Sequence, residues 1–401
     1  MKKILILGGT INQVPLIEHA KNEGYKVILC DWTSDNPGVI LSDKHYMIST
    51  LDKEAVLDVA IKENIDGIIS NSEPAMPIVS FVSEKLGLIG NSVSSCETLI
   101  SKDKFRVLQE KIGVYAPKHC VVNNLNDFIK KASELIYPII IKPVESSGSR
   151  GTCKVEYYDE KELRDIFFDC RKFSRNDEVS IEQYVEMPDL KLLDGDIFVF
   201  NDDILWDGLF FSIRSKYAPM VPMTQSFPLV LEPYKMEIIK NTISKILKSA
   251  GIIYGEFNIE MYFTKENELF VIEINPRQGG NSIPFLVEQH CGIDMYKLLV
   301  TTCVGDFEYY NFLKNYKRKC NYVSRHPVFS YSDGIYNGIF LSDDVKKYVV
   351  KLEETKKYGD IVNKCTNATD VVGFVNLAFE SYDIQKEICE NLEDKIFVLL
   401  K

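Results

Sequence analysis

The chain has 401 residues, of which 45% are hydrophobic and 26% are charged, a composition typical of globular proteins. Because one core rarely fills so long a chain, we expect two or three domains. The formal net charge of −11 argues against a nucleic-acid partner, and no uncharged stretch approaches the roughly 18 residues of a membrane span. Ten scattered cysteines without a CxxC pair predict reduced thiols and a cytoplasmic location.

The first hundred residues alternate apolar strands with helical segments. Strands are expected at residues 3–7, 26–30 and 65–69, and helices at residues 14–23, 55–63 and 77–86. Continuous apolar strands separated by helices indicate a parallel sheet that is covered on both faces. We therefore predict a Rossmann-like α/β domain over residues 1–98.

Glycines after the first strand, and Asp31 at the end of the second, are two features of dinucleotide-binding domains. The run that starts at Gly8 reads GGTINQ, however, so Thr10 and Gln13 occupy the third and sixth positions of GxGxxG. These side chains replace the glycines that allow the pyrophosphate to approach the backbone closely. The sequence therefore does not predict a nicotinamide or flavin site.

The rest of the chain mixes short strands, hairpin signals and helices, which is typical of α+β architecture. We expect a second domain at residues 99–305, with a small lid subdomain at about residues 115–185. A third, smaller α+β domain is expected at residues 306–401, where an apolar strand at residues 371–378 precedes a helix at residues 383–392.

Two lysines occupy positions that suit anion binding. Lys104 lies in the first turn of a helix predicted to open at Ser101, although a lysine there is usually a solvated surface residue. Lys142 ends a strongly apolar strand, where a charge needs a partner. The loop after it reads VESSGSRGT, and its glycines and hydroxyl residues allow backbone N–H groups to turn toward phosphates. A simple hairpin turn would explain these glycines but not the lysine beside them.

The extended segment IEQYVE offers backbone N–H and C=O groups to the edge of an adenine ring. Within it, Glu182 is a candidate acceptor for the exocyclic amine. This signal is weak by itself, and it gains meaning only beside the other segments.

The strongest signal is a predicted hairpin, NIEMY and ELFVIEI, whose two strands carry acids. Because side chains alternate along a strand, Glu260 and Glu273 would face one another, with Asn275 on the same face. Like charges directly opposed on a sheet are destabilising without a counterion, and this all-oxygen set suits Mg²⁺. Arg277, again on that face, suits bidentate binding of a phosphoryl or carboxylate group.

In this order, the segments resemble those of the ATP-grasp superfamily, in particular its carboxylate–amine ligases. The resemblance rests on Lys104, on IIIKPVESSGSRG, on IEQYVE, and on the paired NIE and EINPRQGG. It covers residues 1 to about 305, and a C-terminal domain is also typical of the superfamily. L-amino-acid ligases are the most similar group and phosphoribosylglycinamide synthetases share the architecture, whereas biotin carboxylases and the carbamoyl-phosphate enzymes are more distant in loop content.

The resemblance implies a set of ATP-binding residues. Phosphate contacts, including those of a flexible loop, are implied for Lys104, Lys142, Ser146, Ser147, Gly148, Ser149 and Gly151. Adenine contacts are implied for Glu182, Tyr184 and Val185, and Asp189 stands where many relatives carry a glutamate for the ribose hydroxyls. Two Mg²⁺ ions, or Mn²⁺, are implied at Glu260, Glu273 and Asn275, and stabilisation of the transferred phosphoryl group at Lys142 and Arg277.

The implied activity is ATP-dependent ligation, in which a small-molecule carboxylate becomes an acyl phosphate and an amine or similar nucleophile then displaces phosphate. Glu73, Arg214, and Arg277 together with Gly279 and Gly280 are candidate substrate contacts. Two alternatives stay open: a phosphoribosylglycinamide synthetase-type ligase of purine biosynthesis, and a nucleotide-binding regulator that does not catalyse. The expected partners are small molecules, with neither nucleic acid nor membrane, and homodimers are common among relatives.

Overall fold

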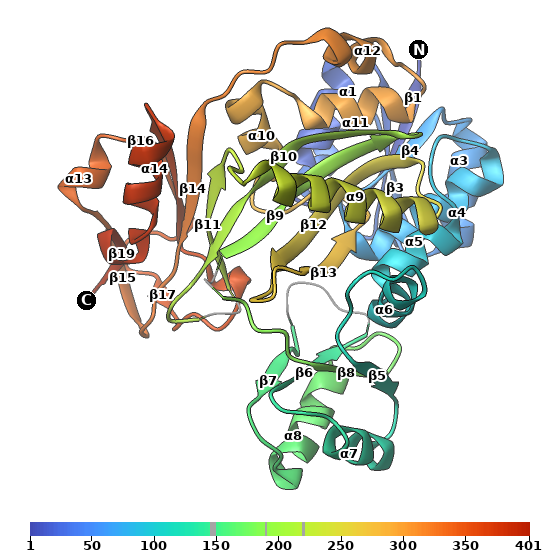
Figure 1. Ribbon diagram of the computed structural model, residues 1–401. Helices are drawn as coiled ribbons and strands as arrows, with labels where there is room; N and C mark the ends of the chain where they lie inside the picture. The colour runs from blue at the N-terminus through green and yellow to red at the C-terminus, as the bar shows by residue number, and fades with distance from the viewer. Residues whose placement is uncertain (145–149, 189–190, 219–220) are drawn as a thin grey trace.

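The computed structural model describes residues 1–144, 150–188, 191–218 and 221–401 (Figure 1). Its N-terminal part is a parallel sheet of order β3-β2-β1-β4, as the sequence predicts. The strands are β1 (Lys3–Leu7), β2 (Lys26–Asp31), β3 (Lys44–Met47) and β4 (Gly67–Ile69). The helices of this part are α1 (Val14–Asn22), α2 (Pro37–Leu41), α3 (Lys53–Glu63) and α4 (Met76–Leu86).

Alternate residues of β1 enter two different cores. Leu5 and Leu7 pack with α3 and α4, whereas Ile4 and Ile6 pack with α1 and with α11 (Met295–Cys303), which comes from much later in the chain. The predicted parallel sheet is therefore covered on both faces, and a distant helix supplies part of one cover.

A small lobe of four strands lies at the bottom of Figure 1. Its sheet has the order β5-β8-β6-β7. The strands are β5 (His119–Val122), β6 (Ile139–Pro143), β7 (Cys153–Val155) and β8 (Val179–Gln183), and the helices are α7 (Leu125–Ser133) and α8 (Glu160–Arg171). Phe128 and Phe167 of the two helices pack on Ile139 and Ile181 of the sheet, so the lobe has its own core. The chain enters it through α5 (Val93–Ile100) and α6 (Lys102–Lys111).

The largest element is an eight-stranded sheet of order β13-β12-β9-β10-β11-β14-β18-β16, in which all neighbours are antiparallel. Its first five strands are β9 (Lys191–Phe200), β10 (Asp203–Arg214), β11 (Pro222–Phe227), β12 (Tyr254–Phe263) and β13 (Leu269–Asn275). Helix α9 (Pro233–Ser249) packs on one face, and α10 (Ile283–Cys291) packs on the other.

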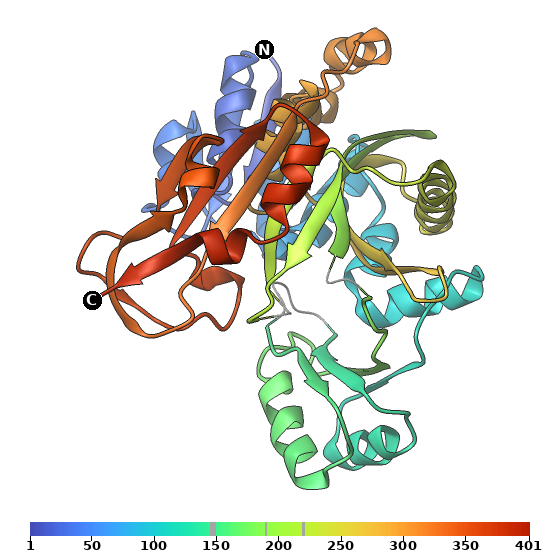
Figure 2. The ribbon, with the colours of Figure 1, turned by 60° about the vertical axis from the view of Figure 1, so that its left-hand side comes forward.

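The C-terminal segment is joined to the central sheet by strand pairing. Its strands β14 (Tyr322–Val328), β18 (Gly373–Phe379) and β16 (Val349–Glu354) continue the central sheet beyond β11 (Figure 2). A second sheet has the order β17-β15-β19 and consists of β15 (Gly334–Leu341), β17 (Ile361–Val362) and β19 (Ile396–Leu400). The helices of this part are α13 (Asp343–Lys346), α14 (Tyr382–Cys389) and α15 (Leu392–Lys395), whereas α12 (Glu308–Asn315) packs in the same core as α11. Hydrogen bonding between β11 and β14 makes one sheet from the two segments.

Within the described ranges, no helix combines the length and the apolar character that crossing a membrane would require.

Candidate functional site

A cavity of about 530 Å³ lies where the small lobe meets the β12 and β13 end of the central sheet. One part of its wall is apolar and aromatic, formed by Ile140, Tyr184, Val185, Met187, Tyr262, Phe270 and Ile272. The other part is charged, formed by Glu73, Lys102, Arg106, Lys142, Arg150, Lys154, Glu156, Glu182, Arg214, Glu260, Glu273 and Arg277. The cavity therefore offers an apolar slot beside a cluster of charges, which matches a molecule with a flat ring at one end and anionic groups at the other.

The predicted acidic hairpin is confirmed, because Glu260 of β12 is the direct partner of Glu273 of β13. A register shift follows Glu260, between Glu260 and Met261. Burial raises the pKa of Glu260 above its ordinary value, although Arg214 lies 3.0 Å from its Oε2 atom. Burial also disfavours the charge on Glu273, but Lys102 and neighbouring groups hold its pKa below the ordinary value. One carboxylate of the pair is therefore better stabilised as an anion than the other.

Asn275 contacts this pair but does not line the cavity. Its amide Nδ2 donates to Glu273 Oε1 at 2.8 Å, and its side chain is buried. In the part of the chain that the structure describes, no three His, Cys, Asp or Glu residues form a cluster that could hold a metal. The predicted metal site thus consists of two carboxylates with an asparagine beside one of them.

The predicted lysine at the end of β6 lies in the cavity with a buried partner. Lys142 Nζ is 2.8 Å from Glu182 Oε2, and the two side chains are 8% and 2% exposed. Burial lowers the pKa of Lys142 to about 8. Burial would raise the pKa of Glu182, yet Arg106 and Lys142 bring it down to about 2. Both directions leave the pair ionised near neutral pH.

Glu182 therefore has partners other than the adenine amine that the sequence suggested. Its Oε1 atom lies 3.3 Å from Arg106 Nε, and its Oε2 atom contacts Lys142. Each oxygen of the carboxylate faces a buried cation. This arrangement stabilises both cations, because a positive charge in an apolar environment needs an anion. The geometry assigns Glu182 to holding two cations in place.

The structure places Lys104, the predicted phosphate contact in the first turn of α6, outside the cavity. Lys104 Nζ pairs with Glu97 at 2.7 Å, and its side chain is 53% exposed and outside the cavity wall. Lys102 lines the cavity instead. The reason is helical periodicity, because Lys102 shares a face with the buried residues Phe105 and Arg106, three and four positions later, whereas Lys104 does not. That spacing was available in the sequence and would have selected Lys102.

Arg106 is a further cavity residue that the sequence analysis missed. It is fully buried and donates to the backbone oxygens of Val271 at 3.2 Å and Ile272 at 2.9 Å. Its guanidinium also lies 5.1 Å from the centre of the Phe270 ring. Arg106 thereby fastens α6 to β13, and no local sequence pattern distinguishes it from a surface arginine.

The predicted adenine segment lines the apolar part of the wall. Tyr184 N–H donates to Pro138 O at 3.0 Å, and Val185 O accepts from Tyr262 Oη at 2.6 Å. Lys154 Nζ lies over the Tyr184 ring, 4.3 Å from its centre. These two backbone groups thus have protein partners, so an adenine edge would meet other groups of this segment.

Several predicted loop residues lie outside the described residues, namely Ser146, Ser147, Gly148, Ser149 and Asp189. Gly151, the last predicted loop residue, is described and has φ +72°. A Cβ atom there would lie 2.9 Å from Phe173 Cδ2, so both the backbone and the packing favour glycine. Its place in the wall is taken by its neighbours Arg150 and Thr152.

The substrate candidates Glu73, Arg214 and Arg277 all line the cavity, whereas Gly279 and Gly280 do not. Glu73 comes from the N-terminal part, and its Oε2 atom lies 3.5 Å from Arg277 Nη2. Burial raises the pKa of Glu73 above its ordinary value, while Arg277 acts against that rise. This contact joins the N-terminal sheet to the loop that follows β13.

Comparison of the chain with known proteins bears on the predicted resemblance. Residues 111–302 match the family profile described as "D-ala D-ala ligase C-terminus". The match covers just under half of the chain and confirms, over these residues, the predicted resemblance to ATP-grasp ligases.

Solved structures share the fold of the whole chain. L-amino acid ligase from Bacillus licheniformis superposes with a TM-score of 0.81 at 20% identity, covering 100% of this chain and 99% of that one. Phosphoribosylglycinamide synthetase from Anaerococcus prevotii superposes with a TM-score of 0.73 at 22% identity, with 100% of both chains covered. The chain therefore has the ATP-grasp fold.

Curated relatives include the carbamoyl phosphate synthase large chain of Thermotoga petrophila, 26% identical over 330 residues. The match covers 76% of this chain but only 28% of that protein. The C-terminal section of the same enzyme from Methanopyrus kandleri is 25% identical over 332 residues, which cover 76% of this chain and 58% of that one. This chain thus spans between about a quarter and three fifths of these relatives' length. From the content of its loops, the sequence is predicted to be less similar to the carbamoyl-phosphate enzymes than to the L-amino-acid ligases.

Proposed function

We propose that the protein is an ATP-dependent ligase, which activates a small-molecule carboxylate as an acyl phosphate and joins it to an amine, releasing ADP and phosphate. One observation carries the proposal. Glu260 and Glu273 face each other in a cavity whose other charged side chains include Lys102, Lys142 and Arg277. Opposed carboxylates next to a cluster of cations suit a metal-bound polyphosphate.

The cavity has a place for each part of Mg·ATP. The aromatic wall at Tyr184 and Phe270 suits the adenine ring, and the cations Lys102 and Lys142 suit the phosphates. Glu182, which also contacts Arg106, holds Lys142 in position. The adenine therefore lies against the small lobe, and the γ-phosphate lies toward the central sheet.

The acidic pair fits divalent cations. Two partly buried carboxylates in direct register repel each other unless a cation lies between them or near them. Glu260 and Glu273 would hold the ions, two Mg²⁺ or Mn²⁺, with Asn275 fixing the orientation of Glu273. When bound, the metal supplies positive charge to the phosphate oxygens, where charge gathers during transfer.

The reaction has two steps, and this chain contributes positioning and positive charge to the first. A substrate carboxylate oxygen bonds to the γ-phosphorus as the bond to ADP breaks, giving an acyl phosphate and ADP. Lys142 and Arg277 stabilise the charge on the equatorial oxygens. In the second step the amine nitrogen bonds to the acyl carbon, phosphate leaves, and the amine releases a proton to solvent.

A phosphate-release screen tests the proposal. Purified protein is given Mg·ATP with pairs of carboxylates and amines, and ADP and inorganic phosphate are measured. We expect one or more pairs to stimulate release, and Glu273→Gln to reduce the turnover of such a pair by about a hundredfold or more. Glu266→Gln is the matched control, because Glu266 lies exposed in the turn of the same hairpin.

The outcomes separate the alternatives. Near-normal turnover of Glu273→Gln would overturn the metal assignment. Stimulation by phosphoribosylamine plus glycine, and by no amino-acid pair, would favour the purine-pathway ligase. Tight binding of Mg·ATP, measured by calorimetry, without release for any pair would favour a regulator.

A further inference from the structure

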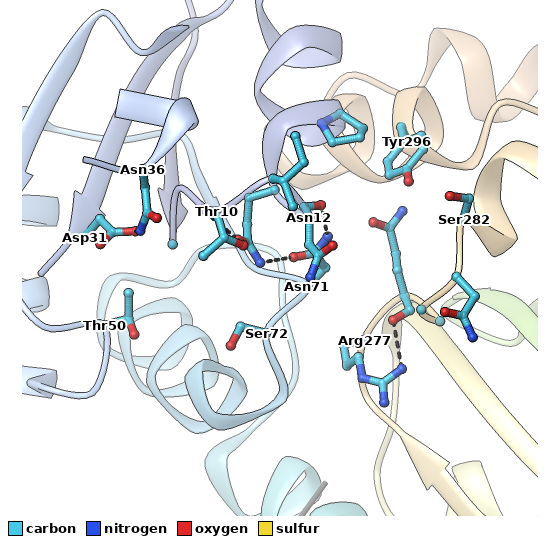
Figure 3. A pocket seen from close by; sticks show the side chains of 18 of the residues that line it. Thr10, Asn12, Asp31, Asn36, Thr50, Asn71, Ser72, Arg277, Ser282 and Tyr296 are labelled. Atoms are coloured by element: carbon cyan, nitrogen blue, oxygen red, sulfur yellow. Dashed lines mark hydrogen bonds between the residues drawn. The ribbon is translucent and has the colours of Figure 1, made fainter. Parts of the chain in front are cut away.

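A second cavity, of about 650 Å³, lies between the N-terminal sheet and the loop that follows β13. Figure 3 shows Thr10, Asn12, Asn71 and Ser72 on one side of this cavity, and Ser282 and Tyr296 on the other. These side chains are polar and uncharged, and the apolar residues Ile11, Pro15 and Trp32 also line the cavity. The N-terminal groups follow strands β1 and β4, at the carboxyl edge of a parallel sheet, where such folds bind ligands.

Arg277 connects this second cavity to the ATP cavity, because it lines both of them. It is the only lysine or arginine among the described residues that line the second cavity. Its Nη1 donates to Gln278 O at 2.9 Å, which fixes the guanidinium at the boundary. A carboxylate bound to Arg277 would therefore lie next to the transferred phosphoryl group.

Asp31, the acidic residue that lines this cavity, accepts hydrogen bonds from groups of the protein. Its Oδ2 atom accepts from Gly9 N at 2.6 Å and from Asn36 Nδ2 at 2.8 Å, and its Oδ1 atom accepts from Thr33 N at 3.1 Å. Asp31 is also 2% exposed. It organises the loop after β1 and is poorly placed to bind a ligand amine.

The polar wall is held in place by hydrogen bonds within it. Gln13 is buried, and its Oε1 atom accepts from Thr10 N at 3.1 Å and from Thr10 Oγ1. Its Nε2 atom donates to Asn71 Oδ1, and Asn71 Nδ2 donates to Asn12 O at 2.7 Å. The loops after β1 and β4 thus form one preorganised surface, as a binding site requires.

The loop on the opposite side is anchored by buried acids of the central sheet. Gly279 N donates to Asp196 Oδ2 at 2.8 Å, and Gln278 Nε2 donates to Glu256 Oε2 at 2.7 Å. Asp196 and Glu256 are both almost completely buried. Both walls of the cavity are therefore fixed, and Arg277 lies where they meet the ATP cavity.

We infer that this second cavity binds the body of the acid substrate, and that the acid is an unphosphorylated molecule bearing hydroxyl or amide groups. The inference rests on the proposed function and adds a substrate class to it. The carboxylate lies at Arg277, and the remainder is held by the neutral hydroxyl and amide side chains. A phosphorylated acid would bring a second anion into a cavity whose single cation already binds the carboxylate.

The first test uses acids that differ by one phosphate group. Acid-dependent ADP and phosphate release is measured with L-serine against O-phospho-L-serine, L-homoserine against O-phospho-L-homoserine, and gluconate against 6-phosphogluconate, with L-glutamine and L-leucine added. We expect kcat/KM at least about tenfold higher for a hydroxyl- or amide-bearing acid than for its phosphorylated counterpart or for L-leucine. Equal or better use of a phosphorylated or apolar acid would overturn the inference and leave the proposed function intact.

The second test locates the acid. Gly280 lines the cavity, has no left-handed φ, and a Cβ atom there would meet nothing within 4 Å. With the best acid of the panel, Gly280→Leu should raise the KM for the acid about tenfold or more and change the KM for ATP less than about twofold. Asn311→Leu, which adds the same side chain on the exposed face of α12, should change neither KM.

An unchanged KM for the acid in Gly280→Leu would place the acid elsewhere and overturn the inference. So would an equal rise in the KM for ATP. If every acid in the panel fails to stimulate release by the wild-type protein, both the proposed function and the inference fail.

Discussion

Lys142 and Glu182 form an ion pair of 2.8 Å that is almost closed to solvent, and Arg106 approaches the same carboxylate from its other side at 3.3 Å. Two buried cations therefore share one anion, and Lys102 adds a third positive charge to the same cavity. The net charge of this group is positive, so a polyphosphate would complete it. In the absence of that ligand, Glu182 is the carboxylate that pairs with both buried cations.

Replacing the shared anion should destabilise the fold. We expect Glu182→Gln to lower the free energy of unfolding by about 3–5 kcal/mol, because it leaves Lys142 and Arg106 buried without a carboxylate. Urea unfolding followed by circular dichroism measures the change. Glu186→Gln is the control, since Glu186 pairs with Lys265 on the surface and its loss should leave the unfolding midpoint unchanged.

The pH dependence of that difference follows from the pKa of Glu182. Burial acts to raise this pKa, but the two cations lower it from the ordinary 4.5 to about 2. Because the folded pKa is depressed, the stabilisation is complete above pH 4.5 and is lost as the pH falls toward about 2. The stability gap between wild type and Glu182→Gln should narrow across this window, and a gap that persists at pH 2 would contradict the assignment.

Lys142 should make activity sensitive to alkaline pH. Burial lowers its pKa to about 8, so its positive charge is lost in the free protein as the pH rises through that value. We therefore expect kcat/KM for ATP to fall above pH 8, since this parameter reports the free enzyme. Lys142→Arg should move the fall to higher pH even if it lowers the maximum, because arginine stays charged. Superimposable profiles would show that another group controls the decline.

The two lysines at the start of α6 give a direct comparison. Lys102 lines the cavity, whereas Lys104 pairs with Glu97 at the surface. Lys102→Ala should lower kcat/KM for ATP by about tenfold or more, which is about 1.4 kcal/mol of transition-state binding. Lys104→Ala should stay within about twofold of wild type. A larger loss for Lys104→Ala than for Lys102→Ala would instead support Lys104 as the phosphate contact, as the family resemblance implied.

This difference shows where sequence patterns suffice and where they do not. The facing of Glu260 and Glu273 could be predicted because a short hairpin and a period of two residues determine which side chains meet. Lys102 and Lys104 are two positions apart, so a motif places both near the phosphates, and only the helical face decides between them. The periodicity of α6 contained that information.

Arg106 could not be predicted in the same way. Its burial depends on the carbonyl groups of Val271 and Ile272, which lie 165 and 166 residues away in the chain. Nothing in the local sequence indicates that these carbonyls will accept from an arginine, and arginine is ordinarily exposed. Long-range partners likewise decide whether Glu182 faces an adenine or two cations.

A buried glutamine in the C-terminal segment leads to a further prediction about the stability of the fold. Gln385 of α14 is buried, and its Nε2 atom donates to Phe227 O at 2.8 Å and to Val323 O at 3.0 Å. It therefore joins α14 to both β11 and β14, on either side of the boundary between the segments. Gln385→Leu removes these donors and should lower the free energy of unfolding by about 1–3 kcal/mol.

The fluorescence of Trp206, which lies on β10, reports whether the central sheet shares this loss of stability. In a Trp32→Phe background it is the only tryptophan of the chain. If the C-terminal strands and the central sheet unfold together, Gln385→Leu should shift the Trp206 fluorescence transition and the circular dichroism transition by equal amounts. The exposed neighbour Lys386 provides the control Lys386→Leu, which should shift neither. A Trp206 transition that is unchanged in Gln385→Leu would instead mean that the C-terminal segment unfolds independently, despite the strand pairing between β11 and β14.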